Sequence, residues 1–138
     1  MDRRFVIAWV VIFVLWMLGG FLLHVVWLSG AYANLGPVFR PLESQGPFFP
    51  FVVIAHALMA GAFVWIYRRG VTARPFIGQG LRYGAAIALL TAVPIYLIAY
   101  AVQPIPRGLV ARQIVGDSIL TLVLGLVVAW LHRATRAT

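Results

Sequence analysis

The chain has 138 residues, of which 63% are hydrophobic and 10% are charged, whereas soluble globular domains carry about 25% charged residues, so an ordinary soluble domain is excluded. The net charge of +8 comes entirely from arginine, but the arginines flank apolar runs instead of forming a basic stripe with exposed aromatic residues, so we expect no binding to nucleic acid. The absence of cysteine excludes disulfides, thiolate metal ligands and thiol catalysis.

Four apolar runs predict four transmembrane helices. They cover residues 5–28, 48–67, 83–102 and 110–131, and each has about the 20 residues that a helix needs to span a bilayer. Turn and charge signals such as GPFFP, RRG and QPIPRG separate the runs. We therefore expect a single all-α domain over residues 1–138. It should be an integral membrane four-helix bundle in up-down-up-down order, with a long outer loop at residues 29–47.

The first apolar run raises a choice between a membrane span and a secretion signal. It is followed by Ala31-Tyr32-Ala33, which is typical of a signal-peptidase cleavage site. The apolar core of a signal peptide is about 7–15 residues long, so the length of this run favours a helix that stays in the protein. We therefore expect His24 to remain within a span and Ala31 to lie in the outer loop.

The distribution of arginine predicts the orientation of the bundle. Eight arginines fall on one side of the predicted spans and three on the other, and the positive-inside rule places the richer side in the cytoplasm. Both termini are therefore expected to be cytoplasmic. The eight are Arg3, Arg4, Arg68, Arg69, Arg74, Arg82, Arg133 and Arg136, and the three are Arg40, Arg107 and Arg112.

The strongly polar residues within the spans all fall in the half that this orientation assigns to the outer leaflet. Polar groups are costly in hydrocarbon and usually face the interior of a bundle. Because four helices each bring such groups to a similar depth, we expect a polar cluster there. Its ionisable members are His24, His56 and Asp117, and its other members are Tyr96, Tyr100, Gln103, Gln113 and Thr121.

The role of this cluster is open between several readings. In one, a histidine or a tyrosine hydroxyl holds Asp117, and the polar groups only lock the helices together. In another, His24, His56 and Asp117 coordinate a divalent metal, or His24 and His56 ligate haem. Neither cofactor is favoured, because the three residues lack a short ligand spacing and adjacent helices lie only about 8–10 Å apart. A small-molecule pocket or a transport path at Asp117 remains.

The chain also resembles a group of short bacterial inner-membrane proteins with four spans and no assigned activity. The likeness covers almost the whole chain and includes the positions of the polar cluster. It implies a bacterial source and a shared fold, and it supplies no activity. The segments that carry it are LLHVVWLSGAY, PFVVIAHALMAGAFVWIYRRG, GQGLRYGAAIALLTAVPIYLIAYAVQP and LVARQIVGDSILTLVLGLVVAW.

The leading functional prediction is a small non-enzymatic protein of the bacterial inner membrane, since the chain has no hydrolytic motif such as a nucleophile elbow. We expect an accessory or assembling subunit whose partners are membrane lipid and other membrane helices, as a homo-oligomer or within a larger complex. The alternative is a haem-, metal- or small-molecule-binding membrane protein that uses His24, His56 and Asp117. A small transporter is the third possibility.

Overall fold

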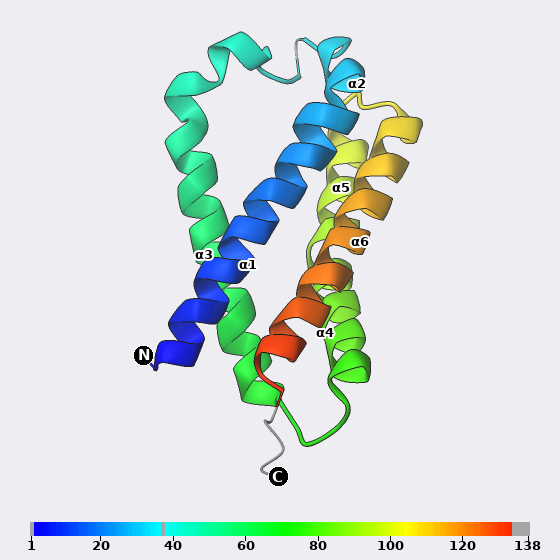
Figure 1. Ribbon diagram of the computed structural model, residues 1–138. Helices are drawn as coiled ribbons and strands as arrows, with labels where there is room; N and C mark the ends of the chain where they lie inside the picture. The colour runs from blue at the N-terminus through cyan, green and yellow to red at the C-terminus, as the bar shows by residue number, and fades with distance from the viewer. Residues whose placement is uncertain (1, 37, 134–138) are drawn as a thin grey trace.

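Residues 2–36 and 38–133 of the computed structural model form an all-α bundle of four long apolar helices (Figure 1). Pro37 of the predicted loop and Arg136 of the cytoplasmic arginine set lie outside these described residues. All four helices are long and apolar enough to cross a membrane, so the chain is a multi-pass membrane protein and the predicted fold class is confirmed. They cover Arg3–Trp27, Gly46–Gly70, Phe76–Val102 and Arg107–Leu131.

The bundle has two distinct ends, which are named here by what they carry. The first span begins and the last span finishes at the terminal end, and the long first connection lies at the loop end (Figure 1). That connection contains a short helix and two 3₁₀ turns. In chain order the elements of the first two spans and their connection are α1 (Arg3–Gly20), the π-helix η1 (Phe21–Trp27), α2 (Ser29–Ala33), η2 (Leu42–Ser44), η3 (Gly46–Phe48) and α3 (Phe49–Gly70).

The third span is divided into α4 (Phe76–Leu90) and α5 (Ala92–Val102) by a turn at Thr91. Pro94 has no N–H to donate to the carbonyl of residue 90. At the same turn, the Thr91 hydroxyl donates to the Ile87 carbonyl at 2.7 Å. The span starts at Phe76, seven residues before the predicted start at residue 83.

The prediction placed this start too late because the first two turns of α4 contain the polar residues Gln79 and Arg82. Gln79 faces the preceding loop, where its side chain hydrogen bonds to the backbone of Thr72 and Arg74. Arg82 is exposed. Polar residues of this kind lower the hydropathy of a segment without preventing a helix, so the apolar pattern alone underestimates the length of the span.

Helices α4 and α6 (Arg107–Leu131) form the most extensive contact of the bundle, and glycines allow it. A Cβ added at Gly80 would lie 2.7 Å from the Gly125 carbonyl oxygen, and one added at Gly84 would lie 2.6 Å from the Thr121 carbonyl oxygen. Side chains at these positions would force the two backbones apart. Gly80 and Gly84 are four residues apart, which is the spacing of the small-residue motif that brings membrane helices together.

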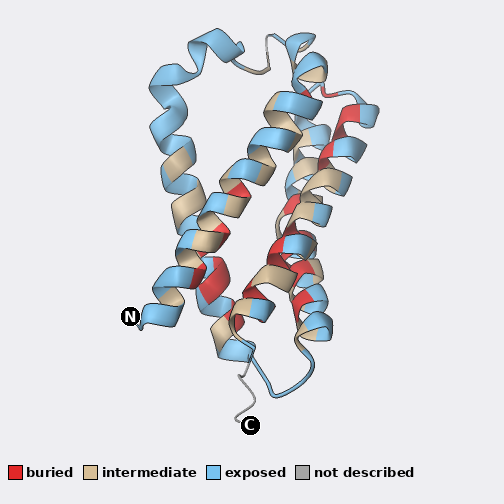
Figure 2. Cartoon of the chain, in the orientation of Figure 1, coloured by how far each residue is buried: buried red, intermediate tan, exposed pale blue. Residues whose placement is uncertain are grey.

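The buried apolar core occupies the terminal half of the bundle (Figure 2). Its members come from all the long helices except α5, and they include Ile12, Val64 and Leu124, which are fully enclosed. The Trp9 indole N–H also donates to the Ala57 carbonyl at 2.8 Å and thereby ties α1 to α3. A second, smaller apolar cluster around Leu28 lies at the loop end.

Candidate functional site

Asp117 on α6 is the centre of the polar site. One of its carboxylate oxygens, Oδ2, accepts a hydrogen bond from the hydroxyl of Tyr96 on α5. The same oxygen lies 3.3 Å from Nε2 of His24, which the π-helix η1 carries. Three spans therefore meet at a single oxygen atom. The prediction that Asp117 is held by a histidine or a tyrosine hydroxyl agrees with this geometry, which contains both partners.

Two further residues extend this network toward the loop end. The Tyr32 hydroxyl on α2 lies 2.7 Å from Nδ1 of His24, and Nε2 of Gln113 donates to the Tyr32 hydroxyl oxygen at 3.0 Å. Gln113 is almost fully buried. Burial raises the pKa of Tyr32, so its phenol keeps the proton that it donates. The continuous series of hydrogen bonds from Gln113 to Tyr96 therefore joins the first, third and fourth spans.

The wide turn of η1 belongs to this site. The Leu28 N–H donates to the Leu23 carbonyl at 3.0 Å, which is the five-residue spacing of a π-helix. The turn lies directly around His24 and leads into α2, which carries Tyr32. Single π-turns within α-helices often lie at functional positions, because they rotate the following residues relative to a regular helix.

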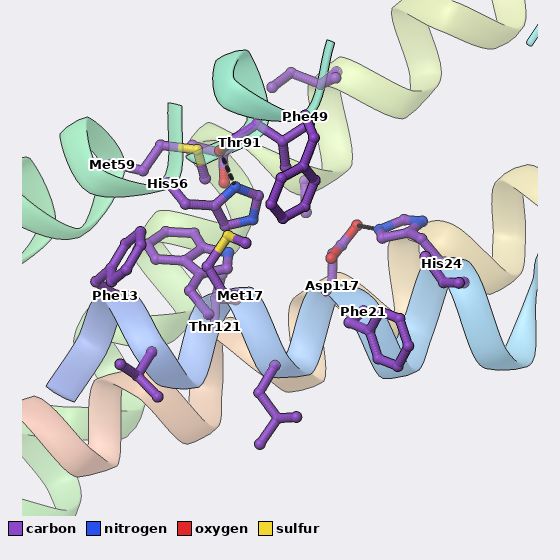
Figure 3. Close-up of a pocket in the computed structure, with 18 of the residues that line it drawn as sticks. Phe13, Met17, Phe21, His24, Phe49, His56, Met59, Thr91, Asp117 and Thr121 are labelled. Carbon is purple, nitrogen blue, oxygen red and sulfur yellow. Dashed lines mark hydrogen bonds and ion pairs between the residues drawn. The ribbon is translucent and has the colours of Figure 1, made fainter. Parts of the chain in front are cut away.

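A cavity of about 770 Å³ lies beside the network, between the first span, α3, α5 and α6 (Figure 3). Asp117, His24 and Tyr96 form part of its wall. The rest of the wall is mostly apolar, and examples are Met17 from α1 and Met59 from α3. The cavity thus combines a large apolar volume with a small polar region at one end.

The cavity is bordered on one side by the gap between α3 and α5. Helix α3 packs along α1 and makes no extensive contact with α5 within the described residues. Figure 1 shows the loop-end half of α3 standing apart from α5 and α6. The lining residues on the two sides of this gap are exposed in the isolated chain: Val52 on α3 is 43% exposed and Ile95 on α5 is 59% exposed. These exposed residues place the gap on the outer surface of the isolated bundle.

His56 enters the cavity from α3 and does not belong to the hydrogen-bond network of Asp117 (Figure 3). Its Nδ1 lies 2.8 Å from the Val52 carbonyl oxygen one helical turn earlier. Its Nε2 lies opposite Gly20 on α1, where an added Cβ would be 3.5 Å away. His24 and His56 therefore line the same cavity, but of these two histidines only His24 contacts Asp117.

The structure brings together only part of the predicted polar cluster. Gln113 and Tyr96 join His24 and Asp117, as described above. Thr121 lines the cavity, but its hydroxyl donates to the Ser118 carbonyl of its own helix at 2.9 Å. Tyr100 is 45% exposed and Gln103 is also exposed at the end of α5, so these two lie outside the network.

The donor atoms of the site do not favour a metal or haem. Within residues 2–36 and 38–133, no group of three or more histidine, aspartate or glutamate side chains is arranged to hold a metal ion. Both ring nitrogens of His24 are engaged, Nδ1 by Tyr32 and Nε2 by Asp117. Iron or zinc bound through His24 would have to replace one of these contacts.

Tyr32 is the functional candidate that sequence reasoning missed. It lies beyond the first apolar run, and only residues within the runs or directly at their ends entered the predicted cluster. The available signal is its spacing, because Tyr32 follows His24 by eight residues, or about two helical turns. A helix that continued past the apolar run would place both side chains on one face.

A second hollow of about 710 Å³ adjoins the cavity at the loop end. The two share His24, Val25 and Gln45 in their walls. Arg40 and Glu43 line the second hollow, and the Arg40 guanidinium lies over the Phe48 ring at 3.6 Å. The polar end of the cavity is thus the end nearest to the long connection.

No protein-family model matches the chain, and no curated protein or solved structure matches it either. Sequence and geometry together therefore identify a multi-pass membrane protein with four long apolar helices, and no family.

Proposed function

We propose that this chain is a non-enzymatic protein of the bacterial inner membrane that binds a small amphipathic molecule in the cavity beside Asp117. The observation that carries the proposal is the cavity itself, which has a volume of about 770 Å³, a mostly apolar wall and a polar network at one end. Binding sites for small molecules typically have volumes of about 300–1,000 Å³ and combine apolar walls with a few placed polar groups. The apolar part of a ligand would lie among Met17, Met59 and Ile95.

The surrounding geometry supports entry from the membrane. The gap between α3 and α5 faces lipid, and the exposed Val52 and Ile95 border it. A molecule dissolved in the bilayer could therefore enter sideways without crossing the polar loop end. The excess of arginine at the terminal end supports an orientation with both termini in the cytoplasm and the cavity in the outer leaflet. A reporter fused after Thr138 should then report a cytoplasmic location, and a periplasmic location would overturn this orientation.

A photo-crosslinking experiment tests the proposed binding. The purified protein in lipid nanodiscs is irradiated with a twelve-carbon alcohol that carries a diazirine in its tail, and the labelled peptides are mapped by mass spectrometry. The proposal predicts labelling concentrated on cavity residues such as Met17 and Met59. Gly20→Leu should abolish this labelling, because its side chain would enter the cavity beside His56.

The matched control is Gly78→Leu, since Gly78 is exposed on α4 and no atom lies within 4 Å of an added Cβ. This variant should keep the labelling pattern. Thermal unfolding and gel filtration of both variants establish that they fold. Labelling spread evenly over the lipid-facing residues of the wild-type protein would contradict the proposal.

An assembling or accessory subunit is the second candidate, and the position of α3 favours it. Among residues 2–36 and 38–133, no helix packs extensively against the loop-end half of α3 on the α5 side, and the exposed residues there include Phe51, Ile54 and Leu58. A helix of another copy or of a different subunit would fill this gap. Native mass spectrometry of the protein released from nanodiscs distinguishes the two candidates. A defined oligomer that Gly20→Leu leaves intact supports assembly, and a monomer opposes it.

A further inference from the structure

We infer that the ligand of this cavity is a cationic amphiphile, with an ammonium head group placed between Asp117 and His56. This inference rests on the proposed function, because it names the chemical class of the molecule that the cavity takes. Three features of the wall carry it: the charge of Asp117, the hydrogen-bonding direction of the network around His24, and the free ring nitrogen of His56.

One tautomer of His24 leaves the Asp117 carboxylate without a cationic partner. The Tyr32 hydroxyl oxygen accepts a hydrogen bond from Gln113 and lies 2.7 Å from Nδ1 of His24, to which it can donate its own hydrogen. In the tautomer in which Nδ1 accepts this hydrogen, His24 is a neutral imidazole whose protonated Nε2 lies 3.3 Å from Oδ2 of Asp117 and 3.5 Å from the Tyr96 hydroxyl oxygen. Tyr96 donates to Asp117 and is also neutral. With His24 in this tautomer, the partners of the carboxylate do not neutralise its charge.

Among the described residues that line the cavity, none is an arginine that could neutralise Asp117, and Asp117 is the one carboxylate. Arg40 lines the adjoining second hollow, where its guanidinium lies over the Phe48 ring. A single charge within hydrocarbon is costly and is usually paired. A cationic ligand would provide the missing partner, whereas an anionic ligand would meet a like charge.

Two acceptor atoms remain free for the head group. Oδ2 of Asp117 holds the contacts to His24 and Tyr96, and Oδ1 accepts no hydrogen bond within the described residues. In His56, Nδ1 faces the Val52 carbonyl, which can only accept, so in the neutral ring Nδ1 carries the proton and Nε2 is an acceptor. An ammonium group has three N–H donors and no acceptor, so it can donate hydrogen bonds to acceptor atoms of this kind.

The hydroxyl donors of the wall are already used, so a carboxylate head would find few partners. The Thr91 hydroxyl donates to the Ile87 carbonyl, the Thr121 hydroxyl donates to the Ser118 carbonyl, and the Tyr96 hydroxyl donates to Asp117. The polar region therefore selects for a head group that donates hydrogen bonds and carries positive charge. The apolar remainder of the cavity accepts the tail.

The experiment compares three probes that differ only in the head group. Twelve-carbon chains with a tail diazirine carry an amine, an alcohol or a carboxylate, and labelling of the cavity is normalised to labelling at the exposed Val10, which does not line the cavity, in the same nanodiscs. Hydrogen bonds to charged groups contribute enough to expect that the amine labels the cavity about 10- to 100-fold more than the carboxylate. Asp117→Asn should reduce the amine to the level of the alcohol.

A second variant keeps the inference testable if Asp117→Asn does not fold. His56→Leu removes the free acceptor on α3 and should lower labelling by the amine about two- to tenfold, with no effect on the carboxylate. Equal labelling by the amine and the alcohol in the wild-type protein would overturn the inference and leave the proposed function intact. Absence of cavity labelling by all three probes would overturn the proposed function itself.

The lipid composition of the nanodisc distinguishes between two sources of the ammonium group, a phospholipid and a free amine. If a phospholipid with a primary amine head is the ligand, replacing choline-headed lipid by amine-headed lipid should suppress labelling by the amine probe several-fold. If a free single-chain amine is the ligand, the exchange of lipid leaves the labelling unchanged, and unlabelled dodecylamine competes. Failure of both competitors would contradict a selective site for ammonium.

Discussion

Replacing Gly84 by alanine should weaken the bundle, whereas the same change at Gly78 in the same helix should not. A Cβ at position 84 would lie 2.6 Å from the Thr121 carbonyl oxygen and 2.7 Å from the Leu122 Cα, while ordinary van der Waals contacts begin at 3.4 Å. The backbones of α4 and α6 would have to separate by about 0.8 Å, the difference between 3.4 Å and 2.6 Å. At Gly78 no atom lies within 4 Å of the added carbon.

The expected magnitude follows from two opposing contributions. Overpacking a close contact costs about 1–3 kcal/mol in the free energy of unfolding. Replacing glycine by alanine within a helix stabilises by roughly 0.5–1 kcal/mol, and this gain applies to both positions. The difference between the two variants therefore isolates the overpacking contribution. Gly84→Ala should be about 1–3 kcal/mol less stable than Gly78→Ala.

Reversible unfolding in mixed micelles, followed by far-ultraviolet circular dichroism during titration with dodecyl sulfate, measures this difference. The two variants and the wild-type protein are titrated in the same micelles, so that errors of extrapolation cancel. If Gly84→Ala is as stable as Gly78→Ala, the close approach of α4 and α6 is not formed in the folded protein. A result of that kind would remove the glycine contact from the explanation of the fold.

Two further predictions concern the terminal half of the bundle. Trp9→Phe removes the indole hydrogen bond to Ala57, so it should destabilise the protein by about 0.6–2 kcal/mol in the same titration. Trp65→Phe, at an exposed position, serves as the control. Equal stabilities of the two variants would oppose a role for this bond. The backbone N–H at the start of α1 and the Arg68 guanidinium hold the pKa of Asp2 below its usual range in the folded protein. Asp2 therefore stabilises the fold at pH values above its pKa in the unfolded chain. This stabilisation is lost as the pH falls through the lower pKa of the folded protein. Arg68→Gln should raise the pKa of Asp2 in a carbon-13 NMR titration, and an unchanged curve would show that the ion pair is absent in solution.

The fold was largely predictable, because hydropathy and length determine how many helices can span a bilayer. The exception was the start of the third span. Gln79 and Arg82 made the first turns of α4 look like a loop, and this error also hid the motif formed by Gly80 and Gly84. The signal was present in the sequence as two glycines four residues apart. It becomes visible only when the span is allowed to begin at Phe76.

The site was predictable in its centre and not at its edges. Polar groups are costly in hydrocarbon, so His24, Asp117 and Tyr96 were predicted to face the interior of the bundle. The structure joins these three residues. Helical spacing placed Tyr100 on the same face as Tyr96, but a tyrosine near the end of a span can also lie at the interface with water. Which of two neighbouring tyrosines faces α6 depends on the packing of α5, and no pattern within one helix determines that packing.

The position of His56 depends on tertiary structure in the same way. Its depth in the second span suggested that it would join the other polar residues. The separation of α3 from α5 instead places it across the cavity from Asp117. This separation arises from the angle at which the helices cross, and the sequence of a single span does not determine that angle.

The π-turn at Phe21–Trp27 has a consequence for how this protein tolerates insertions and deletions. A π-turn is equivalent to one residue added to an α-helix, so the segments on its two sides keep separate rotational registers. Deleting one residue within the turn would leave Trp9 and Ile12 packed as they are. It would convert the turn to a regular α-helical turn, so Tyr32 would keep its place beside Gln113 while the residues within the turn, His24 among them, would shift. The two functions of the first span, packing the bundle and presenting His24, can therefore change independently during evolution.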